Sequence, residues 1–274
     1  MRRWSRGDTA GLLRAPIATD DKYARGVVNL RTGSPEYQGA AVLGVEAAWR
    51  AGAGFVRFSG PPEVASLVLA RRPETVVQAE ASGRAGAWVI GSGTDAGTRS
   101  AAEEQRLRAL LSGATPVVVD AGALDLAPGA AAPRVLTPHA GEFARLRASL
   151  GLAVEARDPA TALREAANLL GSTIVLKSAE TLIAEAGGEV IAVSAATHWL
   201  ATAGTGDVLA GVIGTMIAAN PGASLAAAAA AAVWLHSSAG ASAAGAGGGS
   251  PGHPIVALDV AEALPGVIAE VLAS

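Results

Sequence analysis

The sequence predicts a three-layer αβα sandwich built on a mostly parallel central β-sheet. Apolar segments of strand length alternate with longer segments whose apolar residues recur at helical spacing, a pattern typical of repeated βα units. The strand segments are mostly apolar, as expected of parallel strands that helices cover on both faces. No linker divides the chain convincingly, so we expect one domain over residues 1–274, in which residues 1–25 form a lead-in with one short helix.

The first half of the chain contains four of these strand segments. They are rich in valine, isoleucine and aromatic residues, and turn-forming residues follow them. The strands are expected at 27–30, 55–58, 87–90 and 116–119. Helices are expected at 39–49, from Pro61-Pro62 onward and at 99–111. Proline in the first helical turn costs little, because the N–H that it lacks has no partner there.

The second half contains further βα units and then a helical C-terminal region. Strands are expected at 135–137 and 173–177, with a hairpin of 181–184 and 190–193. Helices are expected from Glu142 to Leu150, after the Asp158-Pro159 cap as far as Leu170, from Asp207 to Asn220, at 223–235 and at 258–271. The Gly/Ala/Ser-rich residues 239–249 are expected to form a loop.

Composition excludes several classes of protein. With 274 residues, 50% hydrophobic and 16% charged, the chain is long and apolar enough to bury a substantial core. A net charge of −3 does not indicate binding to nucleic acid or to an anionic membrane. Cysteine is absent, which excludes disulfides, thiolate metal sites and cysteine nucleophiles. No apolar region follows Met1-Arg2-Arg3-Trp4, and 223–235 is too short to span a bilayer, so we expect a cytoplasmic protein.

The most informative segment is Ala203-Gly204-Thr205-Gly206-Asp207-Val208-Leu209-Ala210-Gly211. Glycines here permit a tight turn into a helix whose free N–H groups and positive dipole end favour an anion such as phosphate. Asp207 at this position is suited to act as a base toward a substrate hydroxyl, while the amides of Gly204, Thr205 and Gly206 form an anion hole. An ordinary N-cap is the alternative role for Asp207.

Other polar residues follow predicted strands, and ligands of open parallel sheets bind at these carboxyl ends. They are Asp120, Thr137-Pro138-His139 and Lys177. Each also has an ordinary structural role: a helix cap for Asp120, a helix start for His139, a solvated charge for Lys177. Gly91-Ser92-Gly93 is either a ligand loop or a tight turn, since it fits neither the phosphate-binding nor the dinucleotide-binding glycine motif.

No protein metal site is predicted. The other histidines have no histidine or carboxylate partner at the spacing of metal ligands. They are His198, His236 and His253.

Longer segments carry a resemblance to a known family. They are Gly39–Gly54, Val118-Val119-Asp120-Ala121-Gly122-Ala123-Leu124, Leu136-Thr137-Pro138-His139-Ala140-Gly141-Glu142-Phe143-Ala144-Arg145-Leu146, Leu176–Thr181 and Leu200–Gly211. From about Val27 to Leu264 the chain resembles the ADP/ATP-dependent NAD(P)H-hydrate dehydratases of the ribokinase-like superfamily. The Gly-Thr-Gly-Asp turn indicates the superfamily, and its combination with Thr-Pro-His-x-Gly-Glu indicates this family.

The resemblance implies a reaction that repairs NADH and NADPH damaged by hydration of the nicotinamide ring. Its cofactors are Mg²⁺ and ADP or ATP, which phosphorylates the ring hydroxyl of the S epimer. It implies that Ala40, Gly93, His139 and Asp207 contact the hydrate. It implies that the nucleotide is held by Lys177, Ser178, Ala179, Glu180, Thr181 and Gly206. It also implies a homo-oligomer, with a tetramer as one form, and a separate NAD(P)H-hydrate epimerase as partner, because the region before Val27 is too short for an epimerase domain.

Three positions depart from the family pattern. The family usually has Gly-Pro-Gly-Leu-Gly in place of Gly91–Asp95, a second aspartate in place of Gly122, and glycine in place of Ser178. Two alternatives therefore remain: a ribokinase-like kinase of a vitamin-precursor alcohol, such as a hydroxyethylthiazole or hydroxymethylpyrimidine, and a silent nucleotide-binding homologue.

Overall fold

The computed structural model describes residues 1–78, 85–154 and 158–273. Within them, one mixed sheet runs through the molecule in the order β1-β10-β9-β8-β7-β6-β5-β2-β3-β4. Its strands are β1 (Arg2–Arg3), β2 (Val27–Arg31), β3 (Phe55–Phe58), β4 (Val76–Val77), β5 (Ala87–Ile90), β6 (Val117–Val119), β7 (Arg134–Leu136), β8 (Thr173–Leu176), β9 (Glu180–Ala184) and β10 (Ile191–Ser194). Strand β9 pairs antiparallel with both of its neighbours, and the other pairs are parallel.

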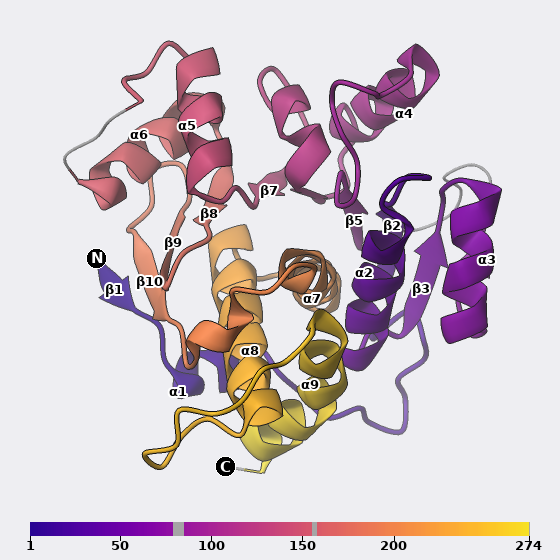
Figure 1. The fold of residues 1–274 in the computed structure, drawn as a ribbon, viewed down its shortest axis with the longest axis vertical. Helices are drawn as coiled ribbons and strands as arrows, with labels where there is room; N and C mark the ends of the chain where they lie inside the picture. The colour runs from indigo at the N-terminus through magenta and orange to yellow at the C-terminus, as the bar shows by residue number, and fades with distance from the viewer. Residues whose placement is uncertain (79–84, 155–157, 274) are drawn as a thin grey trace.

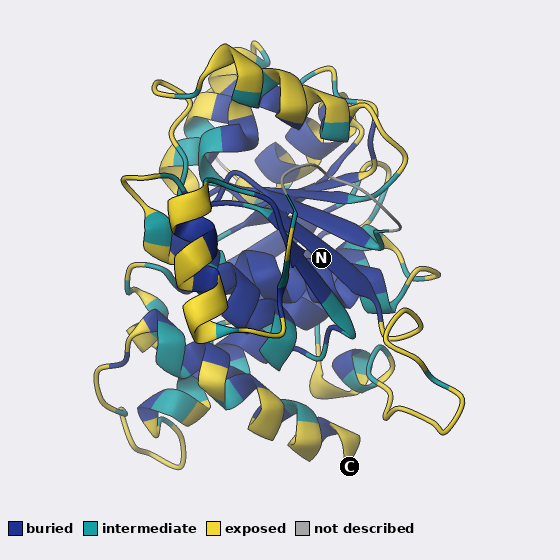
Figure 2. Cartoon of the chain, turned by 90° about the vertical axis from the view of Figure 1, so that its right-hand side faces the viewer, coloured by how far each residue is buried: buried dark blue, intermediate teal, exposed yellow. Residues whose placement is uncertain are grey.

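Helices cover both faces of this sheet (Figure 1). The helices are α1 (Arg6–Ala10), α2 (Gln38–Arg50), α3 (Pro62–Arg71), α4 (Ala101–Leu111), α5 (Ala140–Ser149), α6 (Pro159–Leu170), α7 (Thr205–Ala219), α8 (Leu225–Ala244) and α9 (Ala257–Leu272), with the 3₁₀ helices η1 (Ala121–Leu126) and η2 (His198–Leu200). Successive strand residues pack into two different cores: Val118 joins the core with α2, α3, α7, α8 and α9, whereas Val117 and Val119 join the core with α4, η1, α5 and α6. This alternation explains why the central strands are buried on both faces (Figure 2).

The predicted αβα sandwich with a mostly parallel sheet is confirmed, as is a short helix in the lead-in. The sequence did not predict β1, β4, η1 and η2, which are all short. The loop expected at 239–249 was wrong in its first part, because α8 continues to Ala244 and ends at Gly245. Among the residues that the structure describes, no helix has the length and apolar character needed to cross a membrane.

Candidate active site

The N-terminus of α7 lies beyond the carboxyl ends of the central strands. Gly204 is its N-cap, with a φ of +88° that favours glycine. A Cβ at this position would also lie 2.7 Å from Cδ1 of Leu43. The Thr205 hydroxyl holds the turn by donating to the carbonyls of Leu200 and Thr202, at 2.9 Å each. No side chain caps the first turn of α7, and the N–H groups of Gly204 and Gly206 have no acceptor among the described residues, so they are available to an anion. The N–H of Thr205, also predicted for the anion hole, instead donates to the Thr202 carbonyl at 3.4 Å.

Asp207 is the third residue of α7, so the alternative prediction of an N-cap was wrong. Its carboxylate has no hydrogen-bond donor among the described residues. Burial raises the pKa of Asp207 to about 7, and the negative charge of Asp120 adds to this rise while Lys177 opposes it. A carboxyl group that titrates near neutral pH is suited to accept a proton from a bound hydroxyl.

Asp120 connects three loops at the carboxyl edge of the sheet. The hydroxyl of Thr137 donates to its Oδ1 at 2.6 Å, and the Lys177 ammonium lies 3.0 Å from the same oxygen. The hydroxyl of Ser92 donates to Oδ2 at 2.9 Å. These residues follow β5, β6, β7 and β8, so the predicted convergence of strand-end residues on one edge is confirmed.

Lys177 is thereby fixed above the first turn of α7. A Cβ placed on Gly206 would lie 3.5 Å from Nζ of Lys177. The ammonium group and the free N–H groups of the turn therefore face the same small volume, which is an arrangement suited to a phosphoryl group.

Two cavities meet this turn. The smaller has a volume of about 340 Å³ and includes Thr205 and Gly206 in its lining. The larger has a volume of about 1200 Å³ and is lined in part by Gly204 and Asp207. Consecutive residues of the N-terminus of α7 therefore line two different cavities.

Most of the predicted site residues line one of these cavities. Residues predicted to contact the nucleotide or to form the anion hole line the smaller one: Lys177, Ser178, Ala179, Thr181, Thr205 and Gly206. Residues of the predicted hydrate site or the anion hole line the larger one: Ala40, Gly93, Gly204 and Asp207. His139 and Glu180 line neither cavity.

His139 serves as the N-cap of α5. Its Nδ1 accepts hydrogen bonds from the N–H groups of Gly141, at 3.0 Å, and Glu142. The Glu142 carboxylate accepts in return from the His139 N–H at 2.8 Å, which completes a capping box. The predicted helix-start role is confirmed, and a contact between His139 and a substrate stays a prediction.

A family model described as NAD(P)H-hydrate dehydratase matches residues 28–251. This range includes all the residues that line the two cavities. The chain belongs to the NAD(P)H-hydrate dehydratase family.

Individual relatives agree with this assignment. The chain is 42% identical over 230 residues to the bifunctional NAD(P)H-hydrate repair enzyme Nnr of Mycobacterium tuberculosis, covering 80% of this chain and 47% of that one. The chain thus spans about half the length of such curated relatives. It is 35% identical to the ADP-dependent (S)-NAD(P)H-hydrate dehydratase of Xanthomonas campestris, covering 80% of this chain and 82% of that one. The ADP/ATP-dependent NAD(P)H-hydrate dehydratase of Bacillus subtilis, co-crystallised with ATP and Mg²⁺, superposes with a TM-score of 0.85 at 28% identity over 98% of both chains.

Two departures from the pattern of the dehydratase family contact each other. A Cβ at Gly122 would lie 2.2 Å from the carbonyl oxygen of Thr94, so a side chain at 122 is incompatible with this path of the 91–95 loop. Arg99 fastens the same region by donating to the Gly122 carbonyl at 2.6 Å. Ser92, where the family usually has proline, adds the hydroxyl donor to Asp120.

Arg145 and His236 line the cavities and were not predicted as site residues. Arg145 lies three residues after the Thr-Pro-His-x-Gly-Glu motif, within the segment 136–146 that carries the family resemblance, so that segment was the available signal. Together with Glu142, Leu146 and Ser149 it forms the face of α5 that lines the larger cavity. It is the only basic residue among the described residues that line this cavity.

The described residues contain no group of three or more histidine, aspartate or glutamate side chains that could hold a metal ion. Both oxygens of Asp120 already accept hydrogen bonds. Mg²⁺ commonly binds through substrate phosphates with few protein ligands, so this donor set suits an ion carried mainly by a nucleotide.

Proposed function

We propose that this protein is an ADP- or ATP-dependent NAD(P)H-hydrate dehydratase. It would act on the S epimers of NADH-hydrate and NADPH-hydrate, returning NADH or NADPH and releasing phosphate with AMP or ADP. The observation that carries this proposal is the placement of Asp207, a carboxylate with a pKa near 7 and no hydrogen-bond donor among the described residues. It lines the larger cavity at a helix N-terminus whose neighbouring residue Gly206 lines the smaller one.

Asp207 would act as the general base. It would remove the proton of the ring hydroxyl as that oxygen attacks the terminal phosphorus of the nucleotide. The bond from this phosphorus to the bridging oxygen breaks, and AMP or ADP leaves. The phosphorylated ring then loses phosphate through cleavage of its carbon–oxygen bond, and loss of a proton from the neighbouring carbon restores the double bond.

The smaller cavity would hold the nucleotide, with Lys177 and the N–H groups of Gly204 and Gly206 around the transferred phosphoryl group. The N–H of Thr205 would join them by exchanging its bond to the Thr202 carbonyl for one to the phosphoryl group. Ser178, Ala179, Glu180 and Thr181 would hold the rest of it. Bound Mg²⁺ would supply positive charge that neutralises the phosphates. The protein's own contribution is the fixed position of Lys177, which Asp120 holds.

The larger cavity would hold the hydrate, with Ala40, Gly93 and His139 as the predicted contacts. Its volume of about 1200 Å³ exceeds the usual range for small-molecule pockets, which suits a ligand as large as a dinucleotide. Arg145 would offer the diphosphate of the hydrate a positive charge in a cavity that also contains Asp95, Asp125 and Glu142.

Several parts of the proposal rest on the resemblance alone. They are a single dehydratase domain, a cytoplasmic location, assembly as a homo-oligomer and cooperation with a separate NAD(P)H-hydrate epimerase.

The experiment that tests the function follows absorbance in the reduced-nicotinamide band. Purified protein is mixed with enzymatically prepared NADH-hydrate, Mg²⁺ and either ADP or ATP, and controls omit the nucleotide. We expect a rise that depends on the nucleotide, and the faster nucleotide identifies the preferred donor. Folded protein that binds nucleotide but produces no rise would overturn the proposal. Accumulation of a phosphorylated vitamin-precursor alcohol would then indicate a kinase, and binding without any turnover would indicate a silent homologue.

A further inference from the structure

His236 is a buried side chain in the wall of the smaller cavity that the proposed mechanism does not use. It lies on α8 with 7% of its surface exposed. Its Nε2 is 2.9 Å from the carbonyl oxygen of Thr205, the first residue of α7. The ring therefore lies between the cavity and the turn that carries the candidate catalytic groups.

The contact with Thr205 determines the tautomer of His236. A carbonyl oxygen only accepts hydrogen bonds, so Nε2 must carry the hydrogen. Burial lowers the pKa of His236 to about 4, against the opposing effect of the Thr205 hydrogen bond, and the charge of Lys177 lowers it further. At neutral pH the ring thus has a single N–H, at Nε2, and its Nδ1 is a hydrogen-bond acceptor.

This acceptor has no hydrogen-bond partner in the part of the chain that the structure describes. The hydrogen bond of His236 in the described residues involves Nε2 alone. Nδ1 is also absent from the fully enclosed side-chain atoms of the described residues that make no hydrogen bond, such as Thr32 Oγ1 and Arg99 Nε. Since His236 lines the cavity, Nδ1 is the ring nitrogen that solvent or a ligand in the cavity can reach.

The lining of the cavity around His236 indicates which part of a nucleotide could donate a hydrogen bond to Nδ1. The cavity wall near α8 contains the apolar side chains Val193, Leu200, Leu209 and Val233. Phosphate groups at neutral pH chiefly accept hydrogen bonds, and Lys177 together with the α7 turn already suits them. The matching donors on an adenine nucleotide belong to its nucleoside part: the exocyclic amino group and the ribose hydroxyls.

We propose that Nδ1 of His236 accepts a hydrogen bond from the nucleoside part of the nucleotide and thereby selects it. The inference rests on the proposed function, since it places a nucleotide in the smaller cavity. Leaving a buried acceptor without its donor reduces affinity, so an analogue that lacks the donor should bind at least tenfold more weakly than ADP.

The test measures nucleotide binding by calorimetry, without hydrate and therefore without turnover. The ligands are ADP, purine riboside 5′-diphosphate, which lacks the amino group, and the 2′-deoxy and 3′-deoxy analogues of ADP. We expect wild-type protein to bind one analogue at least tenfold more weakly than ADP. The analogue identifies the donor: the base amino group or one of the two ribose hydroxyls.

Two substitutions separate the two ring nitrogens. In His236→Gln the side-chain amide can still donate to Thr205 but leaves no acceptor at Nδ1. In His236→Asn an amide oxygen can lie near Nδ1, while the donor to Thr205 is lost. We expect His236→Gln to bind ADP about tenfold more weakly and to lose the discrimination between ADP and the analogue, whereas His236→Asn keeps that discrimination.

The outcomes are distinguishable without relying on the variants. Wild-type protein that binds ADP and all three analogues equally overturns this inference and leaves the proposed function intact. Full discrimination retained by folded His236→Gln also overturns it. Wild-type protein that binds neither ADP nor ATP contradicts the proposed function itself.

Discussion

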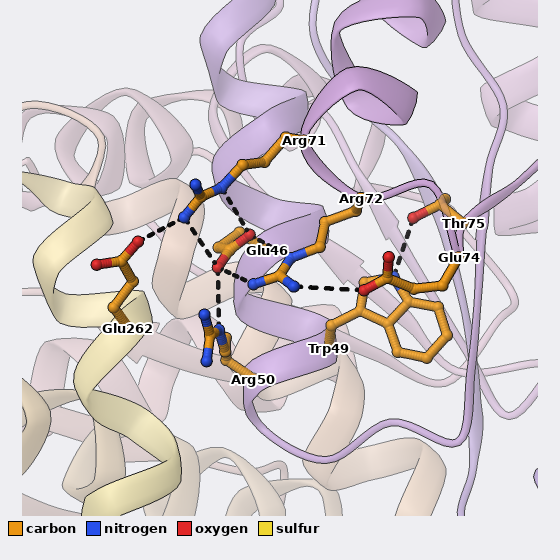
Figure 3. Close-up of polar contacts among 8 residues, drawn as sticks. All are labelled: Glu46, Trp49, Arg50, Arg71, Arg72, Glu74, Thr75 and Glu262. Atoms are coloured by element: carbon orange, nitrogen blue, oxygen red, sulfur yellow. Dashed lines mark hydrogen bonds and ion pairs between the residues drawn. The ribbon is translucent and has the colours of Figure 1, made fainter.

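Glu46 and Asp207 are two carboxylates whose surroundings shift their pKa values in opposite directions. Glu46 on α2 is fully buried and faces the guanidinium groups of Arg50, Arg71 and Arg72 (Figure 3). Burial acts to raise the pKa of Glu46, but hydrogen bonds from the arginines, that of Arg72 foremost, outweigh it and lower the pKa. Asp207 has no such donors, and its pKa rises to about 7. The number of donors, rather than burial alone, therefore determines which carboxylate is permanently charged.

The two surroundings serve different purposes. The Glu46 cluster joins α2 to the end of α3, and Arg71 continues it to Glu262 on α9, so three helices share one network. The positive charge that acts on Asp207 comes from Lys177, but Lys177 forms its ion pair with Asp120 instead. A carboxylate whose oxygens accept several hydrogen bonds stabilises the fold. A carboxylate without such donors is available for chemistry, at some cost in stability.

The largest effect is expected for Asp207→Asn on turnover. The amide cannot accept the hydroxyl proton, so the rate should fall about a thousandfold, within the range for the loss of a general base. Turnover is measured by the absorbance assay, and ADP binding by calorimetry should change only a few-fold. Turnover within tenfold of wild type would show that Asp207 is not the base.

Glu46→Gln is expected to have the largest effect on stability. It leaves three guanidinium groups around a neutral amide, and breaking such a buried ion pair costs about 3 kcal/mol. Denaturant unfolding measures this loss. Glu262→Gln is the matched control, because Glu262 is 45% exposed and, among the described residues, forms an ion pair with Arg71 alone, so its loss should cost about 1 kcal/mol or less. Equal effects of the two substitutions would contradict the central role of Glu46.

Replacing the Asp207 carboxylate by an amide should stabilise the protein, whereas the corresponding change at Glu46 destabilises it. The pKa of Asp207 is about 7 in the folded protein against an ordinary value of 3.8. The contribution of Asp207 to stability is therefore most favourable below pH 4, falls as pH rises between about 4 and 7, and is constant above, because between these values the folded state retains a proton that the unfolded state has lost. Asp207→Asn should remove this cost and raise stability by about 2 kcal/mol at pH 8 and by almost nothing at pH 4. A gain that is independent of pH would contradict the raised pKa.

Features that depend on a local sequence pattern could be predicted from the sequence. The apolar periodicity after Gly204-Thr205-Gly206-Asp207 predicted α7, and the strand-end rule predicted that Asp120 and Lys177 share an edge. The Gly/Ala/Ser composition of 239–249 suggested a loop, but small side chains also let a helix pack closely, and Ala239 and Ala244 are fully buried within α8.

Residues that act through distant partners were not predictable. The contact between His236 and Thr205 spans 31 positions, and no local motif surrounds His236 in its alanine-rich helix. The hydroxyl of Ser92 reaches Asp120 across 28 positions. The strand-end rule identifies the edge of the sheet where such residues meet, but the particular pairs depend on the paths of the connecting loops.

The smallest expected effect is on the KM of a variant at Arg145, an arginine that, unlike those around Glu46, forms no ion pair among the described residues. Arg145 is exposed and has no carboxylate partner among the described residues, although Asp95, Asp125 and Glu142 line the same cavity. If its charge binds the diphosphate of the hydrate, Arg145→Gln should raise the KM for NADH-hydrate about tenfold and leave kcat almost unchanged, because the contact is equally strong in substrate and transition state.

A truncated substrate makes this last prediction decisive. The hydrate of reduced nicotinamide mononucleotide has the reacting ring but no diphosphate, so Arg145→Gln should process it as wild type does. Arg106→Gln is the matched control, since Arg106 is an exposed arginine on α4 that lines neither cavity. A KM effect confined to NADPH-hydrate would instead assign Arg145 to the additional 2′-phosphate. An equal effect on the truncated hydrate would contradict any role in binding the distant half of the substrate.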